Sequence, residues 1–390
     1  MKRESGIAGL DYLEGEQRMK LFQEITEVYK YQKASEFIKE FQIGEGDFVF
    51  TSQSVFETYF QELRSSGAVV HFKSEYGQGE PTDLMVDALL KDFRRTDCKR
   101  VIAIGGGAVI DMAKILVLDG EAKAAEYYQR KVPVRKIRTL VAVPTTCGAG
   151  AEVSNVSIAE MTALQTKLGL AGEEMYPDQA VLIPELLGKL PWHFFVTSAI
   201  DALIHAIESY VSPKSTLYTR MFAKEAMQIF LKGFRMLEEK GPDSREELFE
   251  DFLIASDLAG ISFAIAGTGT VHAMSYPLSG TYHVTHGEAN YQFLTAVFQA
   301  YQETDPDGGI RELNTFLADI FSCEPDMVYK EIEKLLDGLI QRTPLHKYGM
   351  KEEEIRSFAE SVEKSQQRLL GQSYVKFGAD DLEKIYRKLY

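Results

Sequence analysis

The stretch Arg100-Val-Ile-Ala-Ile-Gly-Gly-Gly-Ala-Val-Ile-Asp-Met-Ala-Lys114 decides the fold. Its first five residues form an apolar run that predicts a buried strand, and a helix is expected to follow at once and to continue to about Leu116. The three glycines Gly105, Gly106 and Gly107 let the backbone turn tightly and approach a phosphate closely. The unpaired N–H groups at the start of the helix suit a pyrophosphate, although a plain tight turn between a strand and a helix explains the same glycines.

The same alternation of short apolar runs and helical segments extends to both sides of this stretch. Strands are expected at Asp47–Thr51, Ala68–Phe72 and Thr139–Val143, and helices at Ala34–Gln42, Val55–Ser65 and Thr82–Arg95. Strands that alternate with helices predict a parallel sheet with helices on both faces, which is a Rossmann-like α/β architecture. The glycines do not form Gly-x-Gly-x-x-Gly, so the standard dinucleotide fingerprint is absent.

From about Pro191 the strand-like runs disappear and long amphipathic segments follow, so the second half of the chain is expected to be all-helical. We therefore predict an α/β dinucleotide-binding domain at residues 19–190 and an all-helical metal-binding domain at residues 191–390. Residues 1–18 are interpreted as an extension or a tag, because Met19 begins a new run. A cleft between two such domains is the natural place for a ligand.

Composition limits the classes of partner. The 390 residues carry 58 acidic and 43 basic side chains, a net charge of -15, which argues against nucleic acid or an anionic membrane as a partner. No apolar run is long enough to predict a membrane span. The three cysteines, Cys98, Cys147 and Cys323, are odd in number and widely spaced, which favours a reducing compartment and a cytoplasmic location.

Four residues of the second half form a candidate metal site. Asp201 and His205 are spaced i, i+4 in a segment without proline or glycine, so a helix would place both side chains on one face. His272 and His286 follow in later segments that could converge on that face. Three imidazoles and one carboxylate suit a divalent metal, and Fe²⁺ and Zn²⁺ fit equally well. A single histidine of this kind is more often a structural residue than a ligand.

Taken together, these motifs resemble the iron-containing (group III) alcohol dehydrogenase family. The resemblance rests on Asp-x3-His at Asp201, on His-Ala-Met at His272, on His-Gly-x-x-Asn at His286, and on Gly-Gly-Gly-Ala-x-x-Asp-x-Ala-Lys from Gly105 to Lys114. It implies a dehydroquinate synthase-like architecture, one divalent metal with Fe²⁺ favoured over Zn²⁺, NAD as cofactor, and a homodimer. On this resemblance the cofactor-binding residues are expected to be Ser52, Gly105, Gly106, Gly107, Asp111, Thr145, Thr146 and Lys167.

Several positions depart from the family pattern. Tyr276 stands where many relatives have a histidine linked to proton movement, and its ordinary pKa of about 10 makes it a poor base at neutral pH. Ser52 stands where many relatives have an aspartate that repels the 2′-phosphate of NADP, so exclusion of NADP is weakened. Ala108, Ala149 and Ala151 replace hydroxyl residues of the family motifs near the cofactor.

Further stretches, such as Phe194-Phe-Val-Thr-Ser198 and Gly287-Glu-Ala-Asn-Tyr291, resemble one branch of the family. This closer resemblance implies an NAD-dependent oxidoreductase that interconverts 4-hydroxybutyrate and succinate semialdehyde by metal-assisted hydride transfer. Tyr276 and His283 are the candidate residues for a proton relay or a contact with the substrate carboxylate, and a purely structural role for His283 is the alternative. The alternatives are another metal-dependent dehydrogenase of a primary alcohol, a diol or glycerol, a lyase with the same architecture, and a metal- and nucleotide-binding protein without catalysis.

Overall fold

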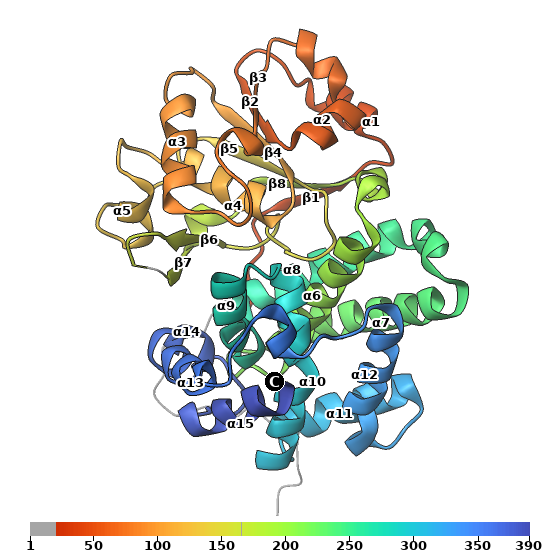
Figure 1. Cartoon of the computed structure of the whole chain (residues 1–390). Coiled ribbons are helices and arrows are strands. Elements are labelled where there is room, and N and C mark those ends of the chain that lie inside the picture. Colours follow the sequence, from red (N-terminus) through yellow and green to blue (C-terminus); the bar gives the residue numbers. More distant parts are fainter. Residues whose placement is uncertain (1–20, 165) are drawn as a thin grey trace, which may run out of the picture.

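The computed structural model describes residues 21–164 and 166–390, and the predicted extension at residues 1–18 lies outside them. Figure 1 shows two halves, with the sheet and its helices at the top and a group of helices below. The last strand of the sheet ends at Leu182 and the first long helix begins at Trp192. The predicted division at residue 190 falls between these two elements.

A six-stranded parallel sheet forms the centre of the upper half. Its strands lie in the order β1 (Glu27–Lys30), β8 (Gln179–Leu182), β5 (Thr139–Pro144), β4 (Arg100–Gly105), β2 (Asp47–Thr51) and β3 (Val69–Phe72). The expected strands at Asp47, Ala68, Arg100 and Thr139 are confirmed as β2 to β5. Strands β1 and β8, which together form one side of the sheet, were not among the predicted strands.

Helices cover both faces of this sheet, as predicted. Along β4 the side chains alternate, so Val101 and Ala103 pack beneath α3 (Asp83–Phe93), α4 (Gly107–Leu116) and α5 (Ala124–Tyr128). Ile102 and Ile104 point to the opposite face, where α1 (Ala34–Phe41) and α2 (Gln53–Tyr59) cover them. The helix expected at Val55–Ser65 is interrupted at Phe60, where the chain changes to a 3₁₀ turn over Gln61–Ser65.

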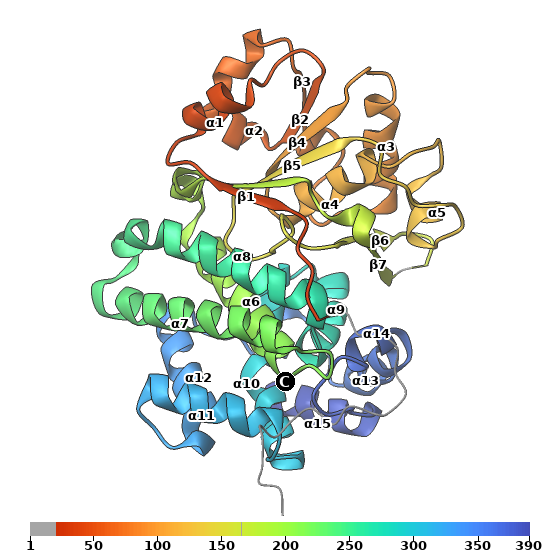
Figure 2. The same ribbon diagram turned by 180° about the vertical axis from the view of Figure 1, so that it is seen from behind.

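An antiparallel hairpin, β6 (Val156–Met161) and β7 (Thr166–Ala171), leaves the sheet and extends toward the helical half. Figures 1 and 2 both place it beside α9 and α14. Figure 2 also shows the segment before β1 running along the helices. Thr216 Oγ1 donates to the Leu21 carbonyl at 3.0 Å, and the ring of Phe22 stacks on Tyr218. Both connections join the two halves.

The lower half is helical throughout, and no strand occurs in residues 183–390. Its helices are α6 (Trp192–Val211), α7 (Leu217–Lys240), α8 (Phe249–Ala266), α9 (Thr270–Tyr282), α10 (His286–Thr304), α11 (Gly309–Phe321), α12 (Val328–Leu339), α13 (Glu354–Ser365), α14 (Gln367–Leu370) and α15 (Ala379–Leu389). Helix α6 packs against α7, α8 and α10. It is long and apolar enough to cross a membrane, but 89% of its apolar window is buried in the molecule, as is typical of a core helix.

Candidate metal centre and cofactor cleft

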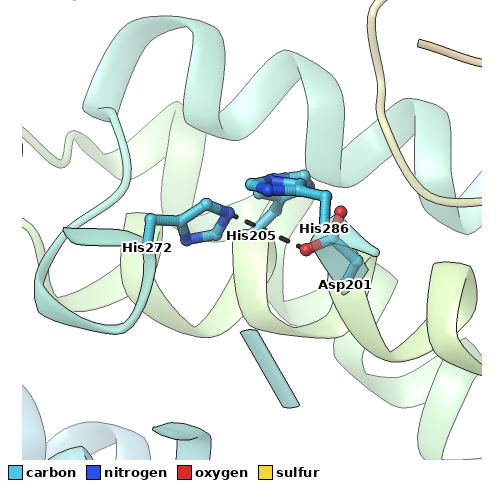
Figure 3. Close-up of side chains that lie close together, drawn as sticks. All are labelled: Asp201, His205, His272 and His286. Atoms are coloured by element: carbon cyan, nitrogen blue, oxygen red, sulfur yellow. Dashed lines mark ion pairs between the residues drawn. The ribbon is translucent and has the colours of Figure 1, made fainter. Parts of the chain in front are cut away.

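Four potential metal ligands come together from three helices. Asp201 and His205 lie one turn apart on α6, His272 lies in the first turn of α9, and His286 is the first residue of α10. One nitrogen or oxygen atom of each side chain lies within 4.8 Å of those of the other three. Figure 3 shows the four side chains gathered around a common point. The convergence that the sequence suggested is therefore present, and its donor set suits a divalent ion.

The close approach of α10 to α6 depends on Gly287. A Cβ atom at this position would lie 2.5 Å from the Thr197 carbonyl oxygen and 3.2 Å from Asp201 Cβ. Any other residue would therefore move the start of α10, and His286 with it, away from Asp201. This contact gives the His-Gly pair of the sequence motif a physical reason.

Two hydrogen bonds select the imidazole nitrogens that face the cluster. Glu208 of α6 accepts from His272 Nδ1 at 2.6 Å and from the backbone N–H of Val271 at 2.7 Å. His205 Nδ1 lies 3.2 Å from the Gly148 carbonyl oxygen, to which it donates. With these Nδ1 atoms as donors, the Nε2 atoms of both rings keep their lone pairs for a metal.

Within the described part of the chain, two buried imidazole nitrogens of the cluster lack a hydrogen-bond partner, whose place a bound cation would take. Asn290 Nδ2 donates to Asp201 Oδ1 at 2.6 Å and lies 3.2 Å from His286 Nε2. Within residues 21–164 and 166–390, the buried atoms His272 Nε2 and His286 Nδ1 have no hydrogen-bond partner. Buried polar atoms are nearly always satisfied, and a metal ion among these side chains would satisfy such nitrogens.

The electrostatics keep these groups in the protonation states that a metal requires. Burial disfavours the Asp201 carboxylate, but the neighbouring imidazoles and Asn290 outweigh burial and hold the pKa of Asp201 below its ordinary value. Burial lowers the pKa of His205 to about 3, against the opposing charge of Asp201. The carboxylate is thus ionised and the imidazole neutral at pH 7, as metal ligands must be.

A cavity of about 590 Å³ connects this cluster with the glycine turn of the α/β half. The α/β half contributes Gly107, Ala108, Asp111, Thr146 and Lys167 to its walls, and the helical half contributes Asp201, His205, His272, Tyr276, His286 and Arg368. The cavity therefore lies between the halves, as predicted, and it is large enough for a nucleotide together with a small substrate.

The three glycines bring α4 close to its neighbours at one end of this cavity. A Cβ atom on Gly105 would lie 2.6 Å from Val109, and one on Gly107 would lie 2.8 Å from the Cβ of Ala149. Gly106 precedes α4 as its cap residue without a side-chain hydrogen bond, so the first N–H groups of α4 remain available at the cavity. The turn therefore combines tight packing with the anion-binding end of a helix.

The other predicted cofactor residues lie at or beside this turn. Thr146 lines the cavity, whereas Thr145 is buried and donates its backbone N–H to the Gly105 carbonyl. Asp111 lines the cavity and accepts from the Ile158 backbone N–H at 3.0 Å, which ties α4 to the hairpin. Ser52 does not line the cavity. It follows β2 and caps α2, and Thr51 just before it pairs with Ile104 of β4, the residue before the three glycines.

The two candidate catalytic residues have different surroundings. Tyr276 lines the cavity, and its ring centroid lies 6.2 Å from that of His286. Burial raises the pKa of Tyr276, although the charges of Arg368 and Lys167 oppose the rise. His283 is exposed, ends α9 in the left-handed conformation with φ 56°, and lies outside the cavity lining. The site as built therefore includes Tyr276 and leaves His283 out.

Three further residues of the site were not predicted from the sequence. Glu208 orients His272, Asn290 connects Asp201 with His286, and Arg368 contributes a guanidinium to the cavity. Asn290 belongs to the His-Gly-x-x-Asn motif, which was a usable signal. Glu208 lies seven residues after Asp201 on the same helix face, a spacing that could have identified it. Nothing local distinguishes Arg368 from other basic residues of amphipathic helices.

Comparison with known proteins agrees with this geometry. A 4-hydroxybutyrate dehydrogenase of Clostridium kluyveri is 48% identical over 372 residues, which are 95% of this chain and 100% of the relative. A 1,3-propanediol oxidoreductase has the same fold, with a TM-score of 0.82 and 22% identity over 95% of this chain and 100% of its own. A sulfoacetaldehyde reductase of Bifidobacterium kashiwanohense, solved with NAD⁺, gives the same TM-score and identity over 96% and 99%. The predicted architecture is thereby confirmed.

Two sequence profiles match almost the whole described chain. Residues 24–184 match iron-containing alcohol dehydrogenase, and residues 195–390 match the C-terminal part of the Fe-containing alcohol dehydrogenase family. The sheet with its glycine turn lies in the first match and the four clustered ligands lie in the second. The chain therefore belongs to the iron-containing alcohol dehydrogenase family.

Proposed function

We propose that the chain is an NAD-dependent dehydrogenase that interconverts 4-hydroxybutyrate and succinate semialdehyde. The observation that carries this proposal is the 48% identity to a 4-hydroxybutyrate dehydrogenase over the full length of that relative. The site supports it, because one cavity joins a cluster of metal-ligand side chains to a glycine turn at the start of a helix. The reaction class thus rests on the site and the substrate on the likeness.

Asp201, His205, His272 and His286 would hold one Fe²⁺ ion, with Zn²⁺ as the alternative, and the α4 turn would hold the NAD pyrophosphate. When bound, the metal supplies Lewis-acid polarisation of the substrate oxygen and the nicotinamide carries the hydride. These assignments follow from the donor set and from the free N–H groups of α4. Thr146, Asp111 and Lys167 would contact the cofactor from the α/β half.

The side chains of the site prepare it for this chemistry. Glu208 fixes the His272 ring and the Gly148 carbonyl fixes the His205 ring, so both rings are oriented before any ligand arrives. The ring of Phe263 lies 4.4 Å from that of His205 and covers it with an apolar surface that excludes water. The Tyr276 hydroxyl has no hydrogen-bond partner in the part of the chain that the structure describes, so it can donate to a substrate oxygen.

Steady-state kinetics at the reduced-nicotinamide absorbance band test this function. The metal-loaded protein is expected to oxidise 4-hydroxybutyrate with a kcat/KM about 10- to 150-fold above that for 1-butanol, since a hydrogen bond to a charged group contributes roughly 1.5–3 kcal/mol. A panel with glycerol, 1,3-propanediol and ethanol covers the other alcohols. Preference for one of these would replace the substrate, and no turnover of any alcohol or aldehyde would favour a binding protein without catalysis.

We also propose that the protein acts as a homodimer in the cytoplasm. The exposed side chains Leu217, Tyr218 and Met221 at the start of α7 support an association surface, because large apolar side chains gathered in one exposed place favour contact with another protein. Light scattering after gel filtration is expected to give twice the chain mass of 43.9 kDa. A mass equal to that of one chain would exclude the dimer.

A further inference from the structure

Arg368 presents an unpaired positive charge to the central cavity. It belongs to the short helix α14, and within residues 21–164 and 166–390 its guanidinium forms no ion pair and no hydrogen bond. It lies close to the hairpin, where a Cβ atom on Gly169 would be 3.8 Å from Arg368 Nη2. The guanidinium therefore spans the space between the helical half and the hairpin of the α/β half.

Tyr276 lines the same cavity as this guanidinium and lies beside the metal centre. The tyrosine is one turn after His272 on α9, and its ring centroid lies 6.2 Å from that of His286. Lys167 Nζ lies 5.4 Å from the centroid of the Tyr276 ring. Arg368 and Lys167 are close enough for both charges to act on the Tyr276 hydroxyl. That hydroxyl and the guanidinium are therefore two donors on one wall of the cavity.

The other cations at the cavity already have partners. Lys167 Nζ lies 2.9 Å from Glu80 Oε2, and it shares one face of β7 with Gly169 because side chains alternate along a strand. Lys214 lies at another part of the wall, beside Gln372. When the Gln372 amide is oriented so that both of its ends are satisfied, its oxygen accepts from Lys214 Nζ at 3.1 Å. Arg368 is thus the cation with free hydrogen-bonding capacity beside Tyr276.

We propose that Arg368 binds the carboxylate of the substrate, with the Tyr276 hydroxyl as a second donor, an inference that rests on the proposed function. The carboxyl carbon of 4-hydroxybutyrate lies on the order of 5 Å from its hydroxyl oxygen. A molecule whose hydroxyl lies among the four ligand side chains can therefore place its carboxylate near Tyr276, whose ring centroid lies 6.2 Å from that of His286. The planar guanidinium matches a carboxylate with two parallel N–H bonds, which an ammonium group cannot form.

Selectivity ratios test this assignment. The ratio of kcat/KM for 4-hydroxybutyrate to that for 1-butanol is measured in the unmodified protein and in Arg368→Met, Arg368→Lys and Lys214→Met. We expect Arg368→Met to lower the ratio at least about tenfold, mainly through a higher KM for the acid.

Arg368→Lys should restore part of the ratio, because the charge remains while the paired geometry is lost. Lys214→Met should change the ratio less than about threefold. Arg95→Met, which removes an exposed arginine outside the cavity lining, serves as the control for loss of a positive charge.

Calorimetric titration of 4-hydroxybutyrate into the protein without NAD gives a reading that does not depend on turnover. The dissociation constant should rise about tenfold in Arg368→Met, while metal content and melting temperature match those of Arg95→Met. An acid preference that persists in Arg368→Met, or that is lost in Lys214→Met instead, overturns the inference and leaves the proposed function standing. An unmodified protein that does not prefer the acid overturns both.

Discussion

Glu208 is expected to control metal affinity although it is not one of the four clustered ligand side chains. Its two oxygens accept from two donors, His272 Nδ1 at 2.6 Å and the Val271 N–H at 2.7 Å, and the side chain is buried. In Glu208→Gln the amide keeps only one acceptor oxygen, so one of these two donors must face an NH₂ group. A buried donor left without a partner costs roughly 1–3 kcal/mol, and part of this cost falls on the fold.

The effect on metal binding depends on how the amide turns. If its oxygen faces His272, the ring keeps its tautomer but loses the charge of its partner, which should weaken metal binding about tenfold. If its oxygen faces Val271, His272 Nδ1 loses its acceptor and the ring is free to move its proton to Nε2, which should weaken binding about 100-fold. The expected loss is therefore between about 1.4 and 2.7 kcal/mol of binding free energy.

Competition with a coloured chelator measures this loss, with Zn²⁺ as a probe that does not oxidise. Glu225→Gln removes an exposed carboxylate of the adjacent helix α7 and provides the matched control. Urea unfolding of both variants separates the cost to the fold from the cost to binding. A Zn²⁺ affinity in Glu208→Gln within about twofold of that in Glu225→Gln would refute the reasoning that the hydrogen bond from His272 to Glu208 prepares the ring for a metal.

Three further outcomes are expected. His205→Ala should lose the bound metal and the activity while it keeps the far-ultraviolet circular dichroism of the unmodified protein, and full metal content by elemental analysis would contradict the assignment. Ser52→Asp should lower kcat/KM for NADP at least about fivefold with little effect on NAD, because like charges a few ångströms apart repel by roughly 1–4 kcal/mol near a surface; kinetics with both cofactors decide this. Burial raises the pKa of Glu152 from 4.5 to about 7, so the folded chain holds the carboxyl proton of Glu152 more tightly than the unfolded chain does. The stabilisation that this proton gives is lost as the pH rises from about 4.5 to about 7. Glu152→Gln, which imitates the protonated form, should therefore gain stability over the unmodified protein as the pH rises, up to about 3 kcal/mol above pH 8, and an equal difference at pH 5 and pH 8 in urea unfolding would contradict this.

The sheet could be predicted where its strands are buried on both faces. In β2 and β4 nearly every side chain is buried, which makes a continuous apolar run that sequence alone reveals. In contrast β1, Glu-Val-Tyr-Lys, lies at the edge of the sheet and has only Tyr29 partly buried. Its pairing with β8 comes from backbone hydrogen bonds to a strand about 150 residues later, and no local pattern reports such a partner.

The metal centre shows a similar limit. The i, i+4 spacing of Asp201 and His205 is a local property of one helix and can be read directly. The approach of His272 and His286 depends on how α9 and α10 pack on α6, and only the family motifs made it predictable. Proximity in sequence was a poor guide to the substrate pocket, because His283 lies three residues before a ligand yet faces solvent at the end of α9. Arg368 reaches the same cavity from a distant helix.

Local charge explains how an acidic protein can accept an anionic substrate. The net charge of -15 is that of the whole chain, and salt screens charges more than roughly 8–10 Å away, so attraction of the acid is decided within the cleft. There Glu80 pairs with Lys167 at 2.9 Å. Burial disfavours the Glu80 carboxylate, but the charges of Lys167 and His286 together outweigh this desolvation and keep the pKa of Glu80 low, so the charges of Glu80 and Lys167 offset each other. The charge of Arg368 then remains uncompensated beside Tyr276. Because Lys167 is already paired with Glu80, Arg368 is the cation that can attract the substrate carboxylate in this part of the cleft.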